Sequence, residues 1–246
     1  MMHFRKPAET RAAGRAPSSG VLLLLAAIAS FCPAAHANDR PFQVARTAVM
    51  EDDEQVWSFE SWAQRRGSVR GLSFEPEYTF DSANSIQFEV SRFIDRRGQE
   101  TGHEAEVELK HLFNNIARDG YGWGVSAAVG AERSRGEGTV RSLGLKLPLS
   151  ISIGDDGAYL HLNGGITKAS NSRRAWTASA GIEREVFKRT VLFAEIAHEG
   201  DLRFAQIGAR HWLRREKLAI DLSLQQQRSE GQRASGFVLG VGWYDL

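Results

Sequence analysis

The sequence has very little cysteine: Cys32 is the only one, and it lies within the first 37 residues. Disulfides, cysteine-ligated metals and thiol catalysis are therefore excluded for the rest of the chain. Long apolar runs are scarce as well. The longest, "VLLLLAAIASFCPAA", has about 15 residues, fewer than the roughly 20 that a membrane-spanning helix needs. We therefore expect no retained membrane helix.

This apolar run follows the basic residues Arg5, Lys6, Arg11 and Arg15 and leads into "AHA", which ends at residue 37. The pattern is that of a secretory signal peptide, residues 1–37. The remaining chain has 27 basic and 29 acidic residues, a net charge of −2. This near-neutrality gives no electrostatic footprint for nucleic acid, and we expect no nucleic-acid partner.

Residues 38–53, "NDRPFQVARTAVMEDD", are polar and have no sustained period, so we predict a flexible N-terminal lead. From residue 54 to residue 246 the sequence changes. It falls into segments of about ten residues in which apolar and polar residues alternate, separated by clusters of Gly, Asp, Asn, Ser and Arg. Apolar residues do not recur convincingly at helical spacing. The pattern predicts a single all-β domain over 54–246.

The stretch "GLSFEPEYTF" at 71–80 illustrates the alternation, because its apolar residues share one parity and Glu75 and Glu77 share the other. Similar segments recur to the end of the chain, with weaker ones at 54–64, 190–199 and 203–213. The count is about twelve strands. Ten remain possible if 54–64 and one weak neighbour are not strands.

Alternation alone does not tell which face is buried, and a soluble periplasmic β-sandwich or lipocalin-like barrel would show it too. Export and a polar face that mixes charged with small residues favour a closed antiparallel transmembrane β-barrel in the outer membrane. The aromatic residues favour it as well. If the strands are numbered from a periplasmic N-terminus, two rims gather them: Tyr78, Phe80, Phe113, Tyr121, Trp123, Phe187, Trp212, Trp243 and Tyr244 on one, and Trp62, Trp176, Phe204 and Phe237 near the other.

We expect the polar residues of the alternating segments to line the lumen. These pore-lining candidates are Glu75, Glu77, Glu89, Glu106, Glu108, Lys110, Lys146, Glu183 and Arg210. The acids are concentrated on consecutive strands, and a sparser basic wall would face them. Such a transverse field would orient solutes and favour cations. Alternatively, the charges pair with one another and plug a narrow interior.

Motifs for catalysis are few. No HExxH, phosphate loop or dinucleotide fingerprint is present. Among the histidines, His198 in "AHEGD" has the best acid–base or metal-binding surroundings, but a charged loop tip explains these residues more simply. We therefore predict no catalytic residues, no metal site and no cofactor. An outer-membrane hydrolase remains a minor alternative.

The stretch "FEPEYTFDSANSIQFEVSRFIDRRGQETGHEAEVELKHLF", the glycine-rich segments after it and the closing "VGWYDL" resemble small Gram-negative outer-membrane barrels. The most similar group is the phenol-degradation meta-pathway family, with "ELKHLF" the most specific piece. The resemblance implies a passive pore for small molecules. A non-conducting structural or binding barrel is the alternative. Expected partners are outer-membrane lipid, the barrel assembly machinery and lipopolysaccharide, whose phosphates the arginine-rich turns could bind.

Overall fold

The computed structural model describes residues 42–50, 55–114, 116–154, 157–229, 231–244 and 246. All of them belong to one compact unit. The signal peptide predicted over residues 1–37 lies outside the described residues, so the structure does not bear on it. Within the described residues, no helix is both long and apolar enough to span a membrane.

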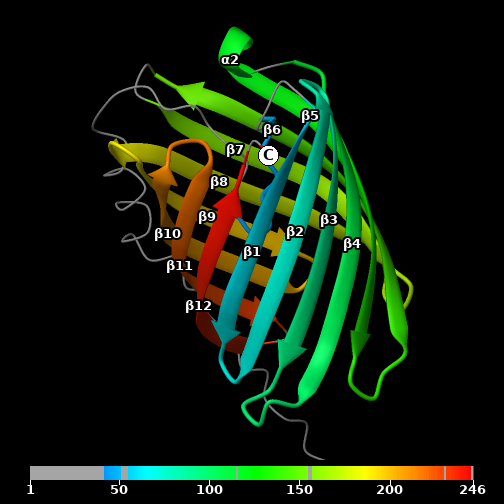
Figure 1. Ribbon diagram of the computed structural model, residues 1–246. Helices are drawn as coiled ribbons and strands as arrows, with labels where there is room; N and C mark the ends of the chain where they lie inside the picture. The colour runs from blue at the N-terminus through cyan, green and yellow to red at the C-terminus, as the bar shows by residue number, and fades with distance from the viewer. Residues whose placement is uncertain (1–41, 51–54, 115, 155–156, 230, 245) are drawn as a thin grey trace, which may run out of the picture. The chain divides into compact units, whose positions relative to one another are not determined.

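Twelve antiparallel strands form a closed barrel in which each strand pairs with its neighbours in sequence and β1 pairs with β12 (Figure 1). The strands are β1 (Val56–Arg66), β2 (Val69–Asp81), β3 (Asn84–Ile94), β4 (Glu100–Leu112), β5 (Tyr121–Ser134), β6 (Thr139–Ile153), β7 (Ala158–Ala169), β8 (Ala175–Phe187), β9 (Thr190–Glu199), β10 (Leu202–Arg214), β11 (Leu218–Ser229) and β12 (Gln232–Trp243). The prediction of a closed antiparallel barrel of twelve strands is confirmed. The three weak segments are β1, β9 and β10, so the ten-strand alternative is wrong.

A short helix, α2 (Ile116–Asp119), joins β4 to β5. β1 begins and β12 ends at the same end of the barrel as this helix, at the top of Figure 1. We call it the α2 end and the other the opposite end. The ladder between β1 and β12 runs from Phe59 paired with Trp243 to Arg66 paired with Gly236. This ladder closes the sheet and leaves no free edge.

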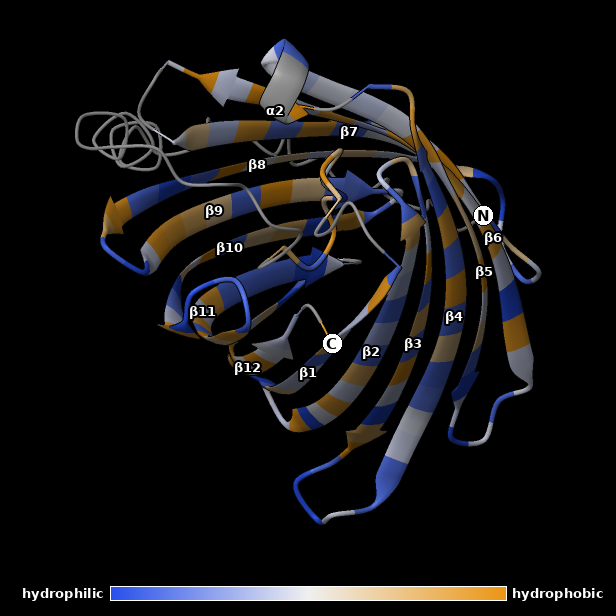
Figure 2. Ribbon diagram, turned by 45° about the horizontal axis from the view of Figure 1, so that its top comes forward, coloured by the Kyte–Doolittle hydropathy of each residue, from blue (hydrophilic) through white to orange (hydrophobic). Residues whose placement is uncertain are grey.

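Burial in this barrel is inverted with respect to a soluble protein. Leu72 on β2 is 60 % exposed, whereas Glu75 on the same strand is only 3 % exposed. Hydrophobic and hydrophilic residues alternate along the strands (Figure 2). Because successive side chains of a strand point to opposite faces, one parity forms an apolar outer surface and the other a polar lumen. Such an outer surface is characteristic of barrels surrounded by lipid.

Aromatic side chains gather on the outside near the α2 end, as the sequence predicted for most of that rim. The ring of Tyr78 packs against Trp57 and Phe80, and the ring of Phe113 lies 4.3 Å from that of Trp123. Rings at this height are typical of a membrane interface.

Four of the predicted rim aromatics are instead inside the barrel. Trp212 and Tyr244 are buried against each other, Phe204 is buried, and Trp62 lines an interior cavity. The prediction was wrong for these four because it considered only the height of each residue along its strand. Parity decides the face: Trp212 shares the inward parity of Arg210, and Tyr244 follows the outward Trp243.

Candidate functional site: the lumen and the segment inside it

Residues Phe42–Met50 run through the middle of the lumen without regular secondary structure (Figure 2). They are the described part of the lead that the sequence analysis predicted over 38–53. We call them the inner segment. Ala45 and Ala48 have no exposed surface, and Phe42 and Thr47 are almost fully buried. The prediction of a lead did not include this burial.

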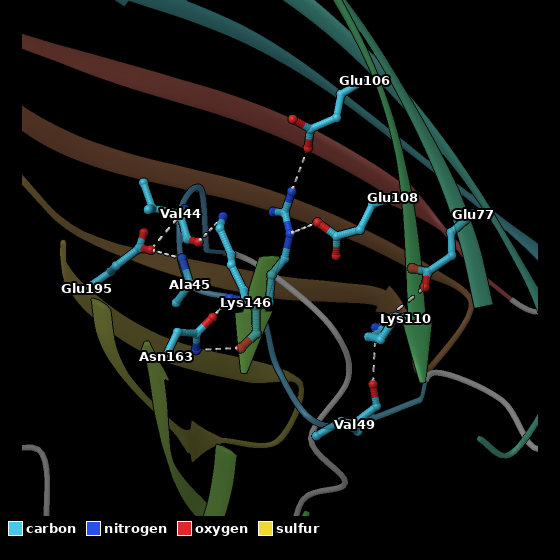
Figure 3. Close-up of polar contacts among 11 residues, drawn as sticks. Val44, Ala45, Val49, Glu77, Glu106, Glu108, Lys110, Lys146, Asn163 and Glu195 are labelled. Carbon is cyan, nitrogen blue, oxygen red and sulfur yellow. Dashed lines mark hydrogen bonds and ion pairs between the residues drawn. The ribbon is translucent and has the colours of Figure 1, made fainter. Parts of the chain in front are cut away.

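Glu195 on β9 binds the first half of the inner segment by its main chain (Figure 3). The carboxylate accepts the N–H of Gln43 at 3.0 Å, the N–H of Val44 at 2.9 Å and the N–H of Ala45. The carbonyl oxygen of Val44 accepts a hydrogen bond from Lys146 Nζ at 3.4 Å. Hydrogen bonds to charged groups are stronger than neutral ones, so this half of the segment is anchored firmly.

The second half is bound by residues from three other strands. Asn163 on β7 accepts the Arg46 N–H at 2.7 Å and donates to the Arg46 carbonyl at 2.8 Å. Ser150 Oγ on β6 accepts the Ala48 N–H at 2.7 Å, and Lys110 Nζ on β4 lies 3.4 Å from the carbonyl oxygen of Val49. The lumen thus satisfies main-chain donors and acceptors in both halves of the segment, as buried backbone requires.

The Arg46 side chain reaches the acidic wall of the lumen. Its Nε lies 2.8 Å from Glu108 Oε2, and its Nη2 lies 3.5 Å from Glu106 Oε1 (Figure 3). Burial alone would lower the pKa of Arg46, but Glu108, Glu106 and Glu75 outweigh it, and this pKa lies above its usual value. Arg46 is therefore a permanent positive charge among the lumenal carboxylates.

Apolar contacts hold both ends of the inner segment. The Phe42 ring packs edge-on against Phe193 and lies 5.1 Å from the ring of His161. Gly181 makes room for it, since a Cβ there would lie 2.8 Å from the Phe42 ring. At the other end, Val49 packs against Ile116 of α2 and against a tyrosine of β7.

All nine pore-lining candidates lie on the inward parity of their strands. Buried among them are Glu75, Glu77, Glu108, Lys110, Glu183 and Arg210, while Glu89, Glu106 and Lys146 are partly buried. Lys110 lies 3.4 Å from Glu77 as well as from the inner segment. The acidic wall therefore faces the arginine and backbone of the inner segment in addition to the predicted basic residues.

Arg210 belongs to a separate cluster near the α2 end. Its guanidinium binds Asp221 through two nitrogens, at 2.7 and 2.8 Å, and Glu60 at 3.0 Å. The Tyr244 hydroxyl donates to Glu60, and the rings of Trp212 and Tyr244 lie 5.6 and 5.4 Å from the guanidinium carbon. The cluster links β10, β11 and β1 with the residue after β12, so it ties the barrel seam from within.

One constellation was missed by the sequence analysis. Ser150 Oγ lies 2.8 Å from His161 Nδ1, and His161 Nε2 lies 3.4 Å from Glu183 Oε1. This is the order of a serine–histidine–acid row. Ser150 and His161 have no exposed surface, however, and Ser150 accepts the Ala48 N–H. Here the row supports the inner segment. His198, the histidine singled out from the sequence, is exposed on the outward parity of β9.

The residues that bind the inner segment come from strands far apart in sequence, and for that reason no local motif announces them. Glu195 is 150 residues from Ala45, and Asn163 is 117 residues from Arg46. Their only sequence signal is the inward parity that they share with the predicted lumenal residues.

One cavity adjoins the inner segment, and another lies farther along the barrel. One, of about 100 Å³, lies beside Phe42 and Gln43 and is lined by Glu75, Glu89 and Trp62, among others. The second, of about 500 Å³, lies at the opposite end. Arg66 there hydrogen-bonds three glutamines, Gln64, Gln225 and Gln227.

Comparison with known proteins gives similarity at the level of fold. No family model matches the sequence, and no curated protein matches it, so the resemblance to the meta-pathway family is not shown. Among solved structures, the KdgM porin aligns with a TM-score of 0.60 at 10 % identity, over 77 % of this chain and 99 % of that one. The NanC porin aligns with a TM-score of 0.55 at 8 % identity, over 78 % of this chain and all of the other. The chain therefore has the fold of small outer-membrane porins.

Proposed function

We propose that the protein is a passive outer-membrane pore for small solutes, with a lumen lined by carboxylates and a few basic residues. The observation that carries the proposal is the inverted burial of a closed barrel, with leucines outside and ionisable side chains within. Polar lumens of this kind conduct water and solutes in porins. The fold similarity to the KdgM and NanC porins supports the same reading.

The inner segment occupies the middle of this lumen, so the described state is a narrowed one. The same contacts favour the second candidate, a structural barrel that does not conduct. The pore and the structural barrel differ in whether the inner segment can leave the lumen. Gly122 on β5 offers a way to decide, since a Cβ there would lie 2.3 Å from the carbonyl oxygen of Ala48. Gly144 on β6 also faces the lumen, and a Cβ there would meet only an alanine methyl at 3.9 Å.

Conductance of the purified protein in planar bilayers tests the proposal. We expect small currents from the wild type and from Gly144→Ala, and larger currents from Gly122→Ala, in which the inner segment is displaced. Heat-modifiable gel migration first establishes that all three proteins are folded. Absence of current from all three would then favour the structural barrel and contradict the pore.

Ion selectivity tests the lining. Carboxylates at the wall attract cations and repel anions, so we expect Gly122→Ala to be cation-selective. Replacing Glu75, Glu77 and Glu106 together by Gln in that background should shift the reversal potential toward zero. Cation selectivity that survives the triple replacement would show that these acids do not set the field of the pore.

A further inference from the structure

We propose that the lumen contains a binding site for a short peptide with a basic side chain, and that the inner segment is its built-in occupant. Soluble basic peptides would be the solutes that compete for this site. The choice of solute rests on the pore function proposed above, whereas the binding site does not.

The lumen binds the inner segment mainly through its main chain. Glu195 accepts three consecutive N–H groups, and Asn163 pairs with both polar groups of Arg46. Lys146 and Lys110 donate to carbonyls. None of these contacts depends on the side chains of the occupant. Any short peptide that adopts the same backbone bend could satisfy the same donors and acceptors, because every non-proline residue offers one N–H and one C=O.

One side chain of the inner segment, that of Arg46, is bound specifically. The Arg46 guanidinium lies against the buried Glu108 and the partly buried Glu106, and its charge compensates theirs. The side chain of Glu108 is only 3 % exposed. Both carboxylates attract a positive charge placed between them, so the site favours an occupant that brings a cation to this position.

The inner segment belongs to the same chain as the barrel but is not part of the β-ladder. Its described residues pair with no strand. Its polar contacts with the barrel are to side chains of β4, β6, β7 and β9. An occupant held in this way can leave and be replaced without breaking the barrel. The tether gives it a high effective concentration, so free peptides bind well only when the segment is displaced.

The experiment uses the full mature chain in detergent and four proteins: wild type, Gly122→Ala, Gly144→Ala, and Gly122→Ala combined with Glu106→Gln and Glu108→Gln. The probes are the acetylated, amidated tetrapeptide Val-Ala-Arg-Thr, which copies residues 44–47, and its Val-Ala-Gln-Thr counterpart. The peptides end before Ala48, so the methyl group added at position 122 does not oppose them. Binding is measured by isothermal titration calorimetry.

We expect the arginine peptide to bind Gly122→Ala, and the glutamine peptide to bind it about tenfold more weakly or worse, since a charge-assisted contact is lost. Replacement of the two acids should abolish this preference. Wild type and Gly144→Ala, whose sites are occupied, should bind the arginine peptide more weakly than Gly122→Ala does. Equal binding of the two peptides by Gly122→Ala, or no binding of either, would overturn the proposal.

Release of the inner segment is followed separately by tryptic cleavage after Arg46, read by intact mass. A segment that stays protected in Gly122→Ala and in Gly122→Ala/Gly181→Ala would mean that the site cannot exchange its occupant, which also overturns the proposal. Conductance without peptide binding would support the pore function and contradict the peptide site. Peptide binding without conductance would support the site and contradict the pore.

Discussion

Asn163 binds both main-chain polar groups of Arg46, accepting its N–H and donating to its carbonyl oxygen. This pair of hydrogen bonds fixes the height of the arginine in the lumen. The guanidinium then meets Glu108 and Glu106 on β4, three strands away from Asn163 on β7. Recognition of the backbone and recognition of the charge are therefore coupled through one residue.

Asn163→Leu should loosen the inner segment, because the leucine has a similar shape but leaves both polar groups of Arg46 without their partners. Each lost buried hydrogen bond costs about 1–3 kcal/mol. Tryptic cleavage after Arg46 follows the population of the released segment, so we expect it to be about tenfold faster or more. Gly164→Ala, at a neighbouring position with open space around its Cβ, is the control. Unchanged cleavage in Asn163→Leu would mean that Asn163 does not hold the segment.

Glu195→Gln should free the beginning of the inner segment. A carboxylate has two oxygens that accept the N–H groups of Gln43, Val44 and Ala45, whereas glutamine has one oxygen and would turn an amide donor toward them. Hydrogen exchange of these three amides should become about ten- to a hundredfold faster. The amides in the ladder between β9 and β10 should keep their protection. If those amides also exchange faster, the effect is on the barrel and not on the segment.

Gly181→Ala should weaken the packing of Phe42, because the added methyl group would lie 2.8 Å from its ring. The contact is with a side chain, which can move, so we expect a partial effect. Single-channel recordings should show more frequent openings than the wild type but fewer than Gly122→Ala, whose added methyl meets backbone. Opening frequencies in the reverse order would mean that Phe42, and not Ala48, is the main anchor.

Arg210→Met should destabilise the barrel seam, because Asp221 and Glu60 would be left as buried carboxylates without their counter-charge. Breaking a buried ion pair from one side costs about 3–5 kcal/mol. We expect a lower temperature of transition in heat-modifiable gel migration. Arg215→Met is the matched control, since Arg215 is 48 % exposed in its ion pairs and such pairs contribute about 1 kcal/mol or less. Equal shifts in the two variants would contradict a special role for Arg210.

Strand parity made much of the fold predictable. Because the side chains of a strand alternate strictly, the sequence alone assigned Glu75 and Glu77 to the lumen and Leu72 to the outside, as the structure has them. The same rule, applied more carefully, would have moved Trp212 and Tyr244 inside. Height along a strand does not determine the face to which a side chain points, whereas parity does.

The occupant of the lumen could not be predicted in this way. Residues 42–50 have no period, and the contacts that bury them reach Glu195, Asn163 and Glu108 on strands that are distant in sequence. Arg46 was the available hint of an occupant, because it is a basic residue shortly before strands that carry many lumenal acids. The sequence could show that the acids needed cations, but only the closed barrel brings this cation to them.

The separation between the inner segment and its partners also sets an order of folding. Glu195, Asn163 and Glu108 surround a common site only after β4 to β9 have assembled, and long-range contacts of this kind form late. The segment should therefore dock last and undock first, as the least stable cooperative unit of the molecule. Its docking then reports that the barrel around it is complete.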